Sequence, residues 1–362
     1  MNYQQIYLDL IQKFPDFEIH QNHPLAPYTT LKIGGPADIF IHTKNNFQFK
    51  TILQYLSKNS DFAPLLQGGI KGGLVILGNG SNVLISDSGI RGIVIKNSSQ
   101  KIDILPGKTT SSVTNKISAH RTENDPINYL NFAKIDYDEG SSPKIKVKMT
   151  SGTLLPFAIN YLFNQGITGL QWFAYIPGTI GGAIWYNLHG GSRHFSDYLQ
   201  TITVFNFKTN QIEKLDAQKI DWDYDNSHFQ KNPHLIILNA TFNLYQGDTD
   251  RARQTAAAWI LQKSKVQPMN SAGSIFQNPP LEICQKIWGE QKSTGWIIDH
   301  ELNLKGTKSG QAEIGPQHAN IFTNNGNATA KDFLNLINLV QNKAKEKLNL
   351  NLTPEIKLIG DH

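Results

Sequence analysis

The chain has 362 residues and a formal net charge of +5. This length is enough for two or three domains, and the 39% hydrophobic content is ordinary for a globular protein. The charge favours anionic ligands only mildly, because no run of Lys and Arg marks a nucleic-acid surface. The single cysteine, Cys284, excludes a disulfide framework or a cysteine-based metal cluster, so we expect a buried thiol.

The N-terminal segment predicts an amphipathic helix, because apolar residues from Tyr3 to Phe14 recur at helical spacing. It is too polar to cross a bilayer or to act as an export signal. No later segment of the sequence reaches the length of a membrane span. We therefore predict a cytoplasmic protein that has neither a membrane nor a nucleic acid as a partner.

Short β-branched runs punctuated by Gly and Pro follow at 22–43 and 73–97, and they predict strands joined by tight turns. Two polar stretches interrupt this pattern. We predict an exposed loop at 56–73 and an extended surface insertion with little core of its own at 98–144.

The second half of the chain regains clear patterning. Residues 153–166 predict a helix with Thr153 as its N-cap and Gly166 beyond its end. Alternating runs within 199–245 predict strands, and a helix with Asp248 as its cap follows them.

The C-terminal part predicts one more helix and a final strand at 355–360. The helix begins with a capping box of Thr329 and Asp332, and its apolar face extends to Leu348. Helices and strands mix without a regular βαβ rhythm and without an internal repeat, which indicates an α+β fold.

Two glycine-rich segments are candidates for a ligand site. In GNGSN, 78–82, glycines let successive backbone N–H groups point into one concavity that suits a phosphate. This loop leads into a strand, so it matches neither the dinucleotide fingerprint nor the P-loop. In IPGTIGGAIWYN, 176–187, the backbone can approach a flat or charged ligand closely. A plain β-turn and close packing of backbone are the alternative interpretations.

Two further positions suggest proton chemistry. Ser274 lies in the small-residue turn SAGSIFQNP, 271–279, where a serine can donate a proton if the alkoxide is stabilised. No Gly-x-Ser-x-Gly motif supports a hydrolase nucleophile, and an ST-turn is the structural alternative. Glu355 enters an apolar run and is either an exposed edge charge or a buried group with a purpose. The histidines show no metal-ligand spacing, so we expect no metal site and interpret most of them as solvated or structural. This applies to seven of the eleven histidines, namely His20, His23, His189, His194, His228, His234 and His318.

Taken together and in chain order, these segments resemble the UDP-N-acetylenolpyruvoylglucosamine reductase family. The resemblance also takes in NHPLAPYTTLKIGGPAD, STGWIID and HANIFTNNGNATAKD, and it covers nearly the whole chain except the two polar stretches. It implies an α+β fold with a two-lobed, vanillyl-alcohol-oxidase-like FAD-binding domain and a smaller C-terminal substrate domain. Lobe 1 would be 1–98 with the C-terminal strand 352–362, lobe 2 would be 99–246 with the insertion 98–144, and the substrate domain would be 247–351.

The resemblance further implies the reduction of UDP-N-acetylglucosamine enolpyruvate to UDP-N-acetylmuramate, with FAD and NADPH as cofactors, by a cytoplasmic monomer. This reaction serves peptidoglycan synthesis, and so cell-wall biogenesis, cell shape and cell division. NADPH would reduce the flavin, which would pass the hydride to the methylene carbon of the enolpyruvyl group. Ser274 would then protonate the neighbouring carbon, and Glu355 would orient or stabilise the enolic intermediate. The cofactor-binding residues would be Thr30, Ile33, Gly34, Gly78, Asn79, Gly80, Ser81, Asn82, Gly178, Thr179, Ile180, Gly181, Gly182 and Ala183. The substrate-binding residues would be Tyr224, Asn278, Lys305, His318 and Lys357.

One position departs from the family pattern in a way that matters. The family has Tyr-Arg-x-Ser where this chain has Tyr224 followed by Asp225, and that arginine supports the negative charge formed after hydride transfer. Loss of such a donor typically costs about 10²–10³ in rate, and a carboxylate in its place adds repulsion. We expect Arg193 or Lys231 to supply the missing charge. The alternatives are a flavin oxidoreductase of the same superfamily with another substrate and a non-catalytic homologue that binds a nucleotide sugar.

Two milder departures accompany it. Gln277 stands where a lysine is usual, and NLHGGSRHFSD, 187–197, replaces the asparagine–alanine–glycine segment of the family.

Overall fold

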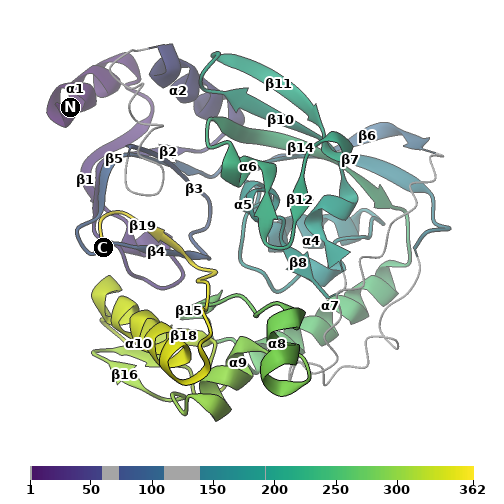
Figure 1. The fold of residues 1–362 in the computed structure, drawn as a ribbon. Helices are drawn as coiled ribbons and strands as arrows, with labels where there is room; N and C mark the ends of the chain where they lie inside the picture. Colours follow the sequence, from purple (N-terminus) through teal and green to yellow (C-terminus); the bar gives the residue numbers. More distant parts are fainter. Residues whose placement is uncertain (1, 59–72, 110–138, 192) are drawn as a thin grey trace.

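The computed structural model describes residues 2–58, 73–109, 139–191 and 193–362. Three sheets with their own helices meet around the middle of the molecule (Figure 1). We call the elements from α1 to β5 lobe 1, those from β6 to α7 lobe 2, and those from β15 to α10 the C-terminal domain. In the described part of the chain, no helix is long and apolar enough to cross a membrane.

Lobe 1 is built on a four-stranded sheet with the order β1-β2-β5-β3. β1 is antiparallel to β2, whereas β5 is parallel to both of its neighbours. Ile39 and Ile93 pack in the same cluster as the apolar side chains of both helices, while Phe40 and Val94 belong to a cluster on the opposite face. The elements are α1 (Tyr3–Lys13), β1 (Glu18–Pro24), β2 (Pro36–Thr43), α2 (Asn46–Lys58), β3 (Gly73–Leu77), β4 (Val83–Ile85) and β5 (Ile90–Asn97).

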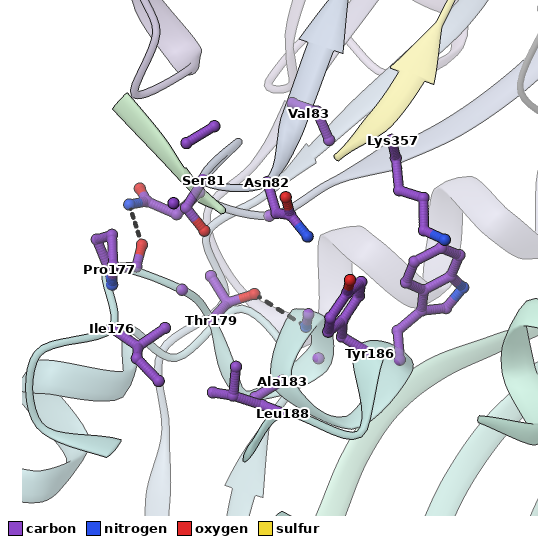
Figure 2. A pocket seen from close by; sticks show the side chains of 18 of the residues that line it. Ser81, Asn82, Val83, Ile176, Pro177, Thr179, Ala183, Tyr186, Leu188 and Lys357 are labelled. Atoms are coloured by element: carbon purple, nitrogen blue, oxygen red, sulfur yellow. Dashed lines mark hydrogen bonds between the residues drawn. The ribbon is translucent and has the colours of Figure 1, made fainter. Parts of the chain in front are cut away.

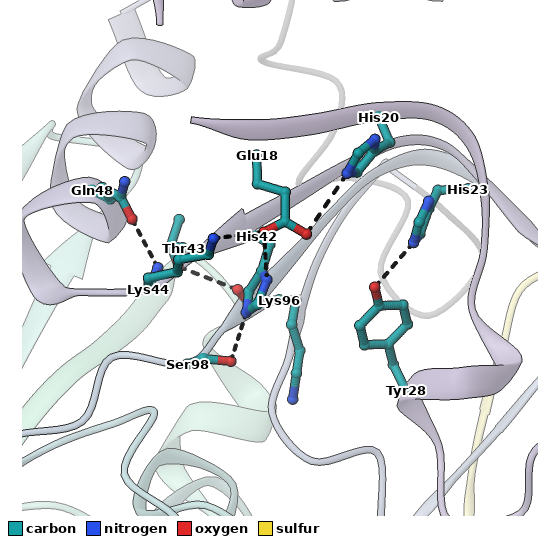
Figure 3. A network of polar contacts seen from close by, with 10 residues as sticks. All are labelled: Glu18, His20, His23, Tyr28, His42, Thr43, Lys44, Gln48, Lys96 and Ser98. Carbon is teal, nitrogen blue, oxygen red and sulfur yellow. Dashed lines mark hydrogen bonds and ion pairs between the residues drawn. The ribbon is translucent and has the colours of Figure 1, made fainter. Parts of the chain in front are cut away.

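A polar network ties the edge strand β1 to the rest of this sheet (Figure 3). The Glu18 carboxylate lies 3.1 Å from both the Nδ1 atom of His42 and the Nζ atom of Lys44. The other ring nitrogen of His42 lies 3.0 Å from the Ser98 hydroxyl, just beyond β5. Hydrogen bonds from Lys44 and His42 outweigh the opposing effect of burial, which is the largest single influence, and they lower the pKa of Glu18.

Lobe 2 is a five-stranded antiparallel sheet with the order β11-β10-β14-β7-β6, and helices pack against it. Two small hairpins accompany this sheet, one formed by β12 and β13 and the other by β8 and β9. The strands are β6 (Ile102–Thr109), β7 (Lys144–Thr150), β8 (His189–Gly190), β9 (Arg193–His194), β10 (Leu199–Asn206), β11 (Gln211–Asp216), β12 (Trp222–Asp223), β13 (Asn226–Ser227) and β14 (Leu235–Tyr245). The helices are α4 (Leu155–Asn164), α5 (Ile180–Tyr186), α6 (His228–Lys231) and α7 (Thr249–Ser264).

The C-terminal domain has a four-stranded antiparallel sheet, β15-β18-β17-β16, covered by α10. Its elements are β15 (Ser271–Ser274), α8 (Leu281–Trp288), α9 (Thr294–Trp296), β16 (Lys308–Ser309), β17 (Ala312–Ile314), β18 (Ile321–Asn324) and α10 (Ala330–Leu348). The last strand, β19 (Lys357–Ile359), leaves this domain and pairs in parallel with β4 of lobe 1.

Most predicted elements are present with the expected ends. Asp248 caps α7, and Thr329 and Asp332 form the predicted capping box of α10. Gly166 follows α4 with a φ of +73°, and Cys284 is fully buried.

Two predictions about lobe 2 are wrong in part. Thr153 does not cap α4: the N-cap position belongs to Leu154, and the Thr153 hydroxyl lies 2.9 Å from that of Thr150 instead. The predicted insertion 98–144 begins with a strand of the lobe 2 sheet, β6, whose ladder shifts register between Ile104 and Lys108 around a Pro-Gly pair. The centre of that insertion, 110–138, lies outside the described residues, and so do residues 59–72 of the predicted loop 56–73. The described ends of that loop are not loop: Leu56, which is buried, belongs to α2, and Gly73 begins β3.

Helix α7 falls in the predicted substrate domain by position, yet it packs on lobe 2. Ala252 and Ala256 belong to the lobe 2 core, and the Trp259 ring meets that of Trp172 edge-on at 6.5 Å between centroids. We therefore propose a domain boundary after α7 rather than at residue 247.

Candidate active site

A cavity of about 750 Å³ lies where the two lobes and the C-terminal domain meet. This is a usual size for a small-molecule site. Most of the residues predicted from the sequence line it: Gly78, Asn79, Gly80, Ser81, Asn82, Gly178, Thr179, Gly181, Gly182, Ala183, Tyr224, Ser274, Asn278, Glu355 and Lys357. In the described residues, no three His, Cys, Asp or Glu side chains gather to hold a metal ion.

The loop 78–82 connects β3 to β4 and forms one wall. Gly80 has a φ of +58°, and a Cβ there would lie 2.3 Å from the backbone oxygen of Tyr28, so only glycine fits. The backbone N–H of Thr30 donates to the Gly80 carbonyl at 3.1 Å. Lys96 reaches the carbonyl of Gly78 from behind the loop, and burial lowers its pKa to about 8.

The segment 176–183 forms the opposite wall and begins a helix that the sequence analysis did not predict. Thr179 is the N-cap of α5, and its hydroxyl accepts a hydrogen bond from the Gly182 N–H at 3.3 Å (Figure 2). A Cβ at Gly181 would lie 2.9 Å from the Ser151 carbonyl oxygen, so this glycine allows α5 to pack closely against the turn that follows β7. The Asn79 side chain donates to the carbonyl of Pro177, which joins the two walls (Figure 2).

Ser274, which lines the cavity, lies at the end of a β-bulge in β15. Ser271 pairs with Thr323 and Ser274 pairs with Ile321, so two residues of β15 stand opposite one of β18. Gly273, inside the bulge, has a φ of +79°. The Asn320 side-chain amide binds both backbone groups of Phe276, two residues after Ser274: it accepts from the Phe276 N–H at 3.0 Å and donates to the Phe276 carbonyl at 2.8 Å.

The segment 353–357 joins the serine turn to the glycine loop. The Glu355 N–H donates to the Ile275 carbonyl at 2.7 Å, and the Lys357 N–H donates to the Asn82 carbonyl at 3.2 Å. The Tyr186 hydroxyl donates to the Glu355 carbonyl at 3.3 Å. Lobe 1, lobe 2 and the C-terminal domain thus share hydrogen bonds at one side of the cavity.

Electrostatics favour a neutral Glu355. Burial raises the pKa of its carboxyl group well above the usual range, and the Asp225 carboxylate adds to the effect while Lys263 and Lys357 oppose it. Burial also lowers the pKa of Lys357, against the opposing pull of Asp225 and Glu355. A neutral carboxyl group can donate a hydrogen bond as well as accept one.

Asp225 occupies the tip of the hairpin β12–β13. Its side chain is 0% exposed, and Oδ1 lies 2.8 Å from Nδ1 of His189. Of the two cations expected to replace the family arginine, Arg193 lines the cavity, whereas Lys231 is exposed at the end of α6 and is not among the lining residues.

Four predicted cofactor residues lie behind the walls rather than on them. Thr30 supports the Gly80 carbonyl, and Gly34 has a φ of +147° and packs against Ile85. Ile33 and Ile180 are buried in the hydrophobic clusters of the C-terminal domain and lobe 2.

Two predicted substrate residues also stand away from the lining. Lys305 pairs with Asp299 at 2.7 Å, and Nδ1 of His318 accepts the Asn320 N–H at 3.2 Å. Lining residues that the sequence analysis missed include Lys263 on α7, His189 on β8 and Asn320 before β18. Helical spacing predicted α7 but gave no indication of which of its side chains faces a cavity.

Comparison with known proteins decides the family. Residues 265–359 match the family model described as UDP-N-acetylenolpyruvoylglucosamine reductase, C-terminal domain. The UDP-N-acetylenolpyruvoylglucosamine reductase of Clostridium novyi is 32% identical over 346 residues, which cover 95% of this chain and 93% of that protein. The chain belongs to the UDP-N-acetylenolpyruvoylglucosamine reductase family.

Other members of the UDP-N-acetylenolpyruvoylglucosamine reductase family agree over almost the whole length. The protein of that name from Staphylococcus aureus is 29% identical over 359 residues, covering 99% of this chain and 97% of its own. The crystal structure of the reductase from Thermus caldophilus aligns with a TM-score of 0.64 at 25% identity, covering 95% of this chain and 98% of that one. The predicted family, the α+β fold class and the prediction of an oxidoreductase of this family are confirmed.

Proposed function

We propose that this protein reduces UDP-N-acetylglucosamine enolpyruvate to UDP-N-acetylmuramate, with FAD as bound cofactor and NADPH as reductant. The observation that carries the proposal is the convergence of Ser274 and Glu355 on the cavity that both glycine-rich walls line. The relatives bear the name of this reductase. The product is a peptidoglycan precursor, so we assign the protein to cell-wall synthesis. We also propose that it acts as a cytoplasmic monomer.

The walls fit a flavin dinucleotide. Gly178 and Gly182 line the cavity, and a Cβ built on them would meet no protein atom nearer than 3.9 Å and 3.4 Å, respectively. The space in front of these glycines is therefore open to a ligand, and phosphate oxygens can reach backbone N–H groups there. We assign Gly78 to Asn82 and Gly178 to Ala183 to the cofactor, with Thr30, Ile33, Gly34 and Ile180 as supports behind them.

The chain's own residues would complete the chemistry. The bound flavin supplies the hydride, which it receives from NADPH. Addition of hydride to the methylene carbon leaves negative charge on the neighbouring carbon and its carboxylate, and the Ser274 hydroxyl gives that carbon a proton. Glu355, kept neutral by burial, donates a hydrogen bond where this charge develops. We assign Tyr224, Asn278 and Lys357 to the UDP-sugar, with Lys305 and His318 at the outer part of the same site.

An anaerobic stopped-flow experiment tests the proposal. NADPH should bleach the flavin absorbance, and added UDP-N-acetylglucosamine enolpyruvate should restore it. A preparation that binds no flavin would refute the cofactor assignment. Bleaching without recovery would instead favour a flavin oxidoreductase of the same superfamily with another substrate. The buried Asp225 is the feature that supports this alternative. A flavin-free protein that binds the nucleotide sugar would support the non-catalytic alternative.

A further inference from the structure

The position of the family arginine is filled by a different kind of group. Tyr224 and Asp225 are the two residues that close the hairpin between β12 and β13. Asp225 has a φ of +50°, a conformation that aspartate adopts more readily than most residues. This turn directs its carboxylate inward, where the Oδ2 atom has no hydrogen-bond partner among the described residues.

Three side chains form a continuous chain of contacts from this buried carboxylate to the open cavity. Nδ1 of His189 lies 2.8 Å from Asp225, and Nε2 of the same ring lies 3.2 Å from the hydroxyl of Tyr224. The Tyr224 and His189 rings stack with centroids 4.7 Å apart. Tyr224 is 43% exposed and lines the cavity, so its hydroxyl is the end of the chain that a ligand can reach.

The donor and acceptor groups of these three side chains determine the direction of the hydrogen bonds between them. An ionised carboxylate can only accept hydrogen bonds. With Asp225 ionised, Nδ1 of His189 therefore carries a proton and donates a hydrogen bond to the Asp225 carboxylate. With a neutral ring, Nε2 accepts from the Tyr224 hydroxyl, whose proton then points at the imidazole rather than at a ligand. With a protonated ring, Nε2 donates to the Tyr224 oxygen, and the phenol proton can be donated to a ligand in the cavity.

We propose that Asp225 holds His189 as an imidazolium when an anionic ligand binds, and that this cation, acting through Tyr224, replaces the arginine of the family motif. The proposal rests on the proposed function, whose substrate carries a carboxylate and a diphosphate. Asp225 and His189 are positioning residues, and Tyr224 is the group that touches the ligand. Binding of the anion then draws one proton onto His189.

Two basic side chains belong to β9, the strand that pairs with the strand of His189. His194, on the neighbouring strand β9, lies 6.5 Å from His189 between ring centroids, and burial lowers its pKa. Arg193, also on β9, interacts with Asp197 and Tyr198.

Other titratable groups face Asp225 from two further elements. They are Tyr186 on α5 and Glu355 and Lys357 in the C-terminal segment. Asp225 is the acidic side chain in direct contact with His189.

Isothermal titration calorimetry measures the predicted proton uptake. The oxidised FAD-loaded protein, without NADPH, is titrated with UDP-N-acetylglucosamine enolpyruvate at pH 7.5 in phosphate and in Tris. We expect the dependence on buffer ionisation enthalpy to give an uptake of about 0.5–1 proton per ligand. His189→Gln and Asp225→Asn should abolish the uptake and weaken binding about 10–100-fold, with unchanged flavin content. His194→Gln, a change of the neighbouring imidazole, should retain the uptake.

Uptake that survives in His189→Gln, or that vanishes in His194→Gln instead, would overturn the proposal. Ligand binding without any uptake in the unaltered protein would do the same and would leave the proposed function intact, whereas absence of binding would refute the proposed function itself. A second measurement needs no ligand. Histidine-labelled holoprotein should show the Nδ1–H tautomer for the ring signal that disappears in His189→Gln, and the Nε2–H tautomer there would refute the contact on which the proposal depends.

Discussion

The backbone N–H of Glu355 donates a 2.7 Å hydrogen bond to the carbonyl of Ile275, the residue that follows Ser274. Residues 80 positions apart in the sequence therefore place the two groups of the proposed proton chemistry side by side. Two residues further along the segment, the Lys357 N–H donates to the carbonyl of Asn82. One short stretch of chain thus fixes the serine turn and the glycine loop in relation to each other, which catalytic geometry requires.

Replacing Ser274 with alanine should slow one half-reaction only. We expect flavin reoxidation by UDP-N-acetylglucosamine enolpyruvate to fall by about 10²–10⁴-fold, because no other group in the bulge can donate a proton there. Flavin reduction by NADPH should stay within two-fold, roughly, since it needs no acid at this position. Ser274→Cys, which keeps a donor, should retain part of the activity. Equal reoxidation rates in Ser274→Ala and the unaltered protein would contradict the assigned role.

Glu355 should make the flavin-free protein less stable as the pH rises. Burial, with a contribution from Asp225, raises the pKa of Glu355 when the protein folds. The folded state then holds a proton that the unfolded state has released, so stability is full below about pH 4.5 and is lost as the pH rises toward the folded pKa, by up to about 1.4 kcal/mol per pH unit. Glu355→Gln cannot ionise and should flatten this slope. Urea denaturation at pH 5 and pH 8 measures it, and parallel slopes in both proteins would show that Glu355 ionises freely.

The motifs that sequence reasoning found share one property: a local signal. Glycine at 80 and 273 is required by positive φ or close backbone approach, and Asp248 caps its helix through its nearest neighbours. A few consecutive residues are enough to determine such features. The loop 78–82, the serine turn and the start of α7 could therefore be predicted.

The features that were missed depend on distant partners. Helix α5 contains Gly181 and Gly182, which disfavour a helix, and it forms because Thr179 caps it and Gly181 fits against Ser151. His189 and Asp225 lie 36 positions apart, and only the meeting of two hairpins brings them to 2.8 Å. No spacing rule connects such residues, so the pair could be found only in the folded chain.

Adding a methyl group at Gly178 should weaken the flavin without weakening the fold. A Cβ at this glycine would meet no protein atom within 3.9 Å, and the residue lines the cavity. We expect Gly178→Ala to change the unfolding free energy of the flavin-free protein by less than about 0.5 kcal/mol. Flavin affinity, measured by fluorescence quenching, should fall about ten-fold or more because the methyl occupies space meant for the cofactor.

Gly80→Ala is the matched comparison. The left-handed φ of +58° and the Tyr28 oxygen 2.3 Å from the added atom should destabilise the flavin-free protein itself by about 1–3 kcal/mol. Unchanged flavin affinity in Gly178→Ala would place the cofactor elsewhere.

The Glu18 network should make strand β1 sensitive to acid. Hydrogen bonds from Lys44 and His42, which outweigh burial, lower the pKa of Glu18 in the folded protein. The carboxylate therefore stabilises the folded state above about pH 4.5, and this contribution disappears as the pH falls through the lowered pKa. Glu18→Gln should cost less than about 1 kcal/mol at pH 6, because the pair is partly exposed, and still less at pH 3. Hydrogen exchange of the β1 amides measures the local opening. Glu290→Gln, which alters a pair with Lys292 at 2.6 Å, serves as the control and should leave the exchange of the β1 amides unchanged at either pH. If Glu18→Gln loses protection of β1 equally at both pH values, the side chain stabilises the strand by packing rather than by charge.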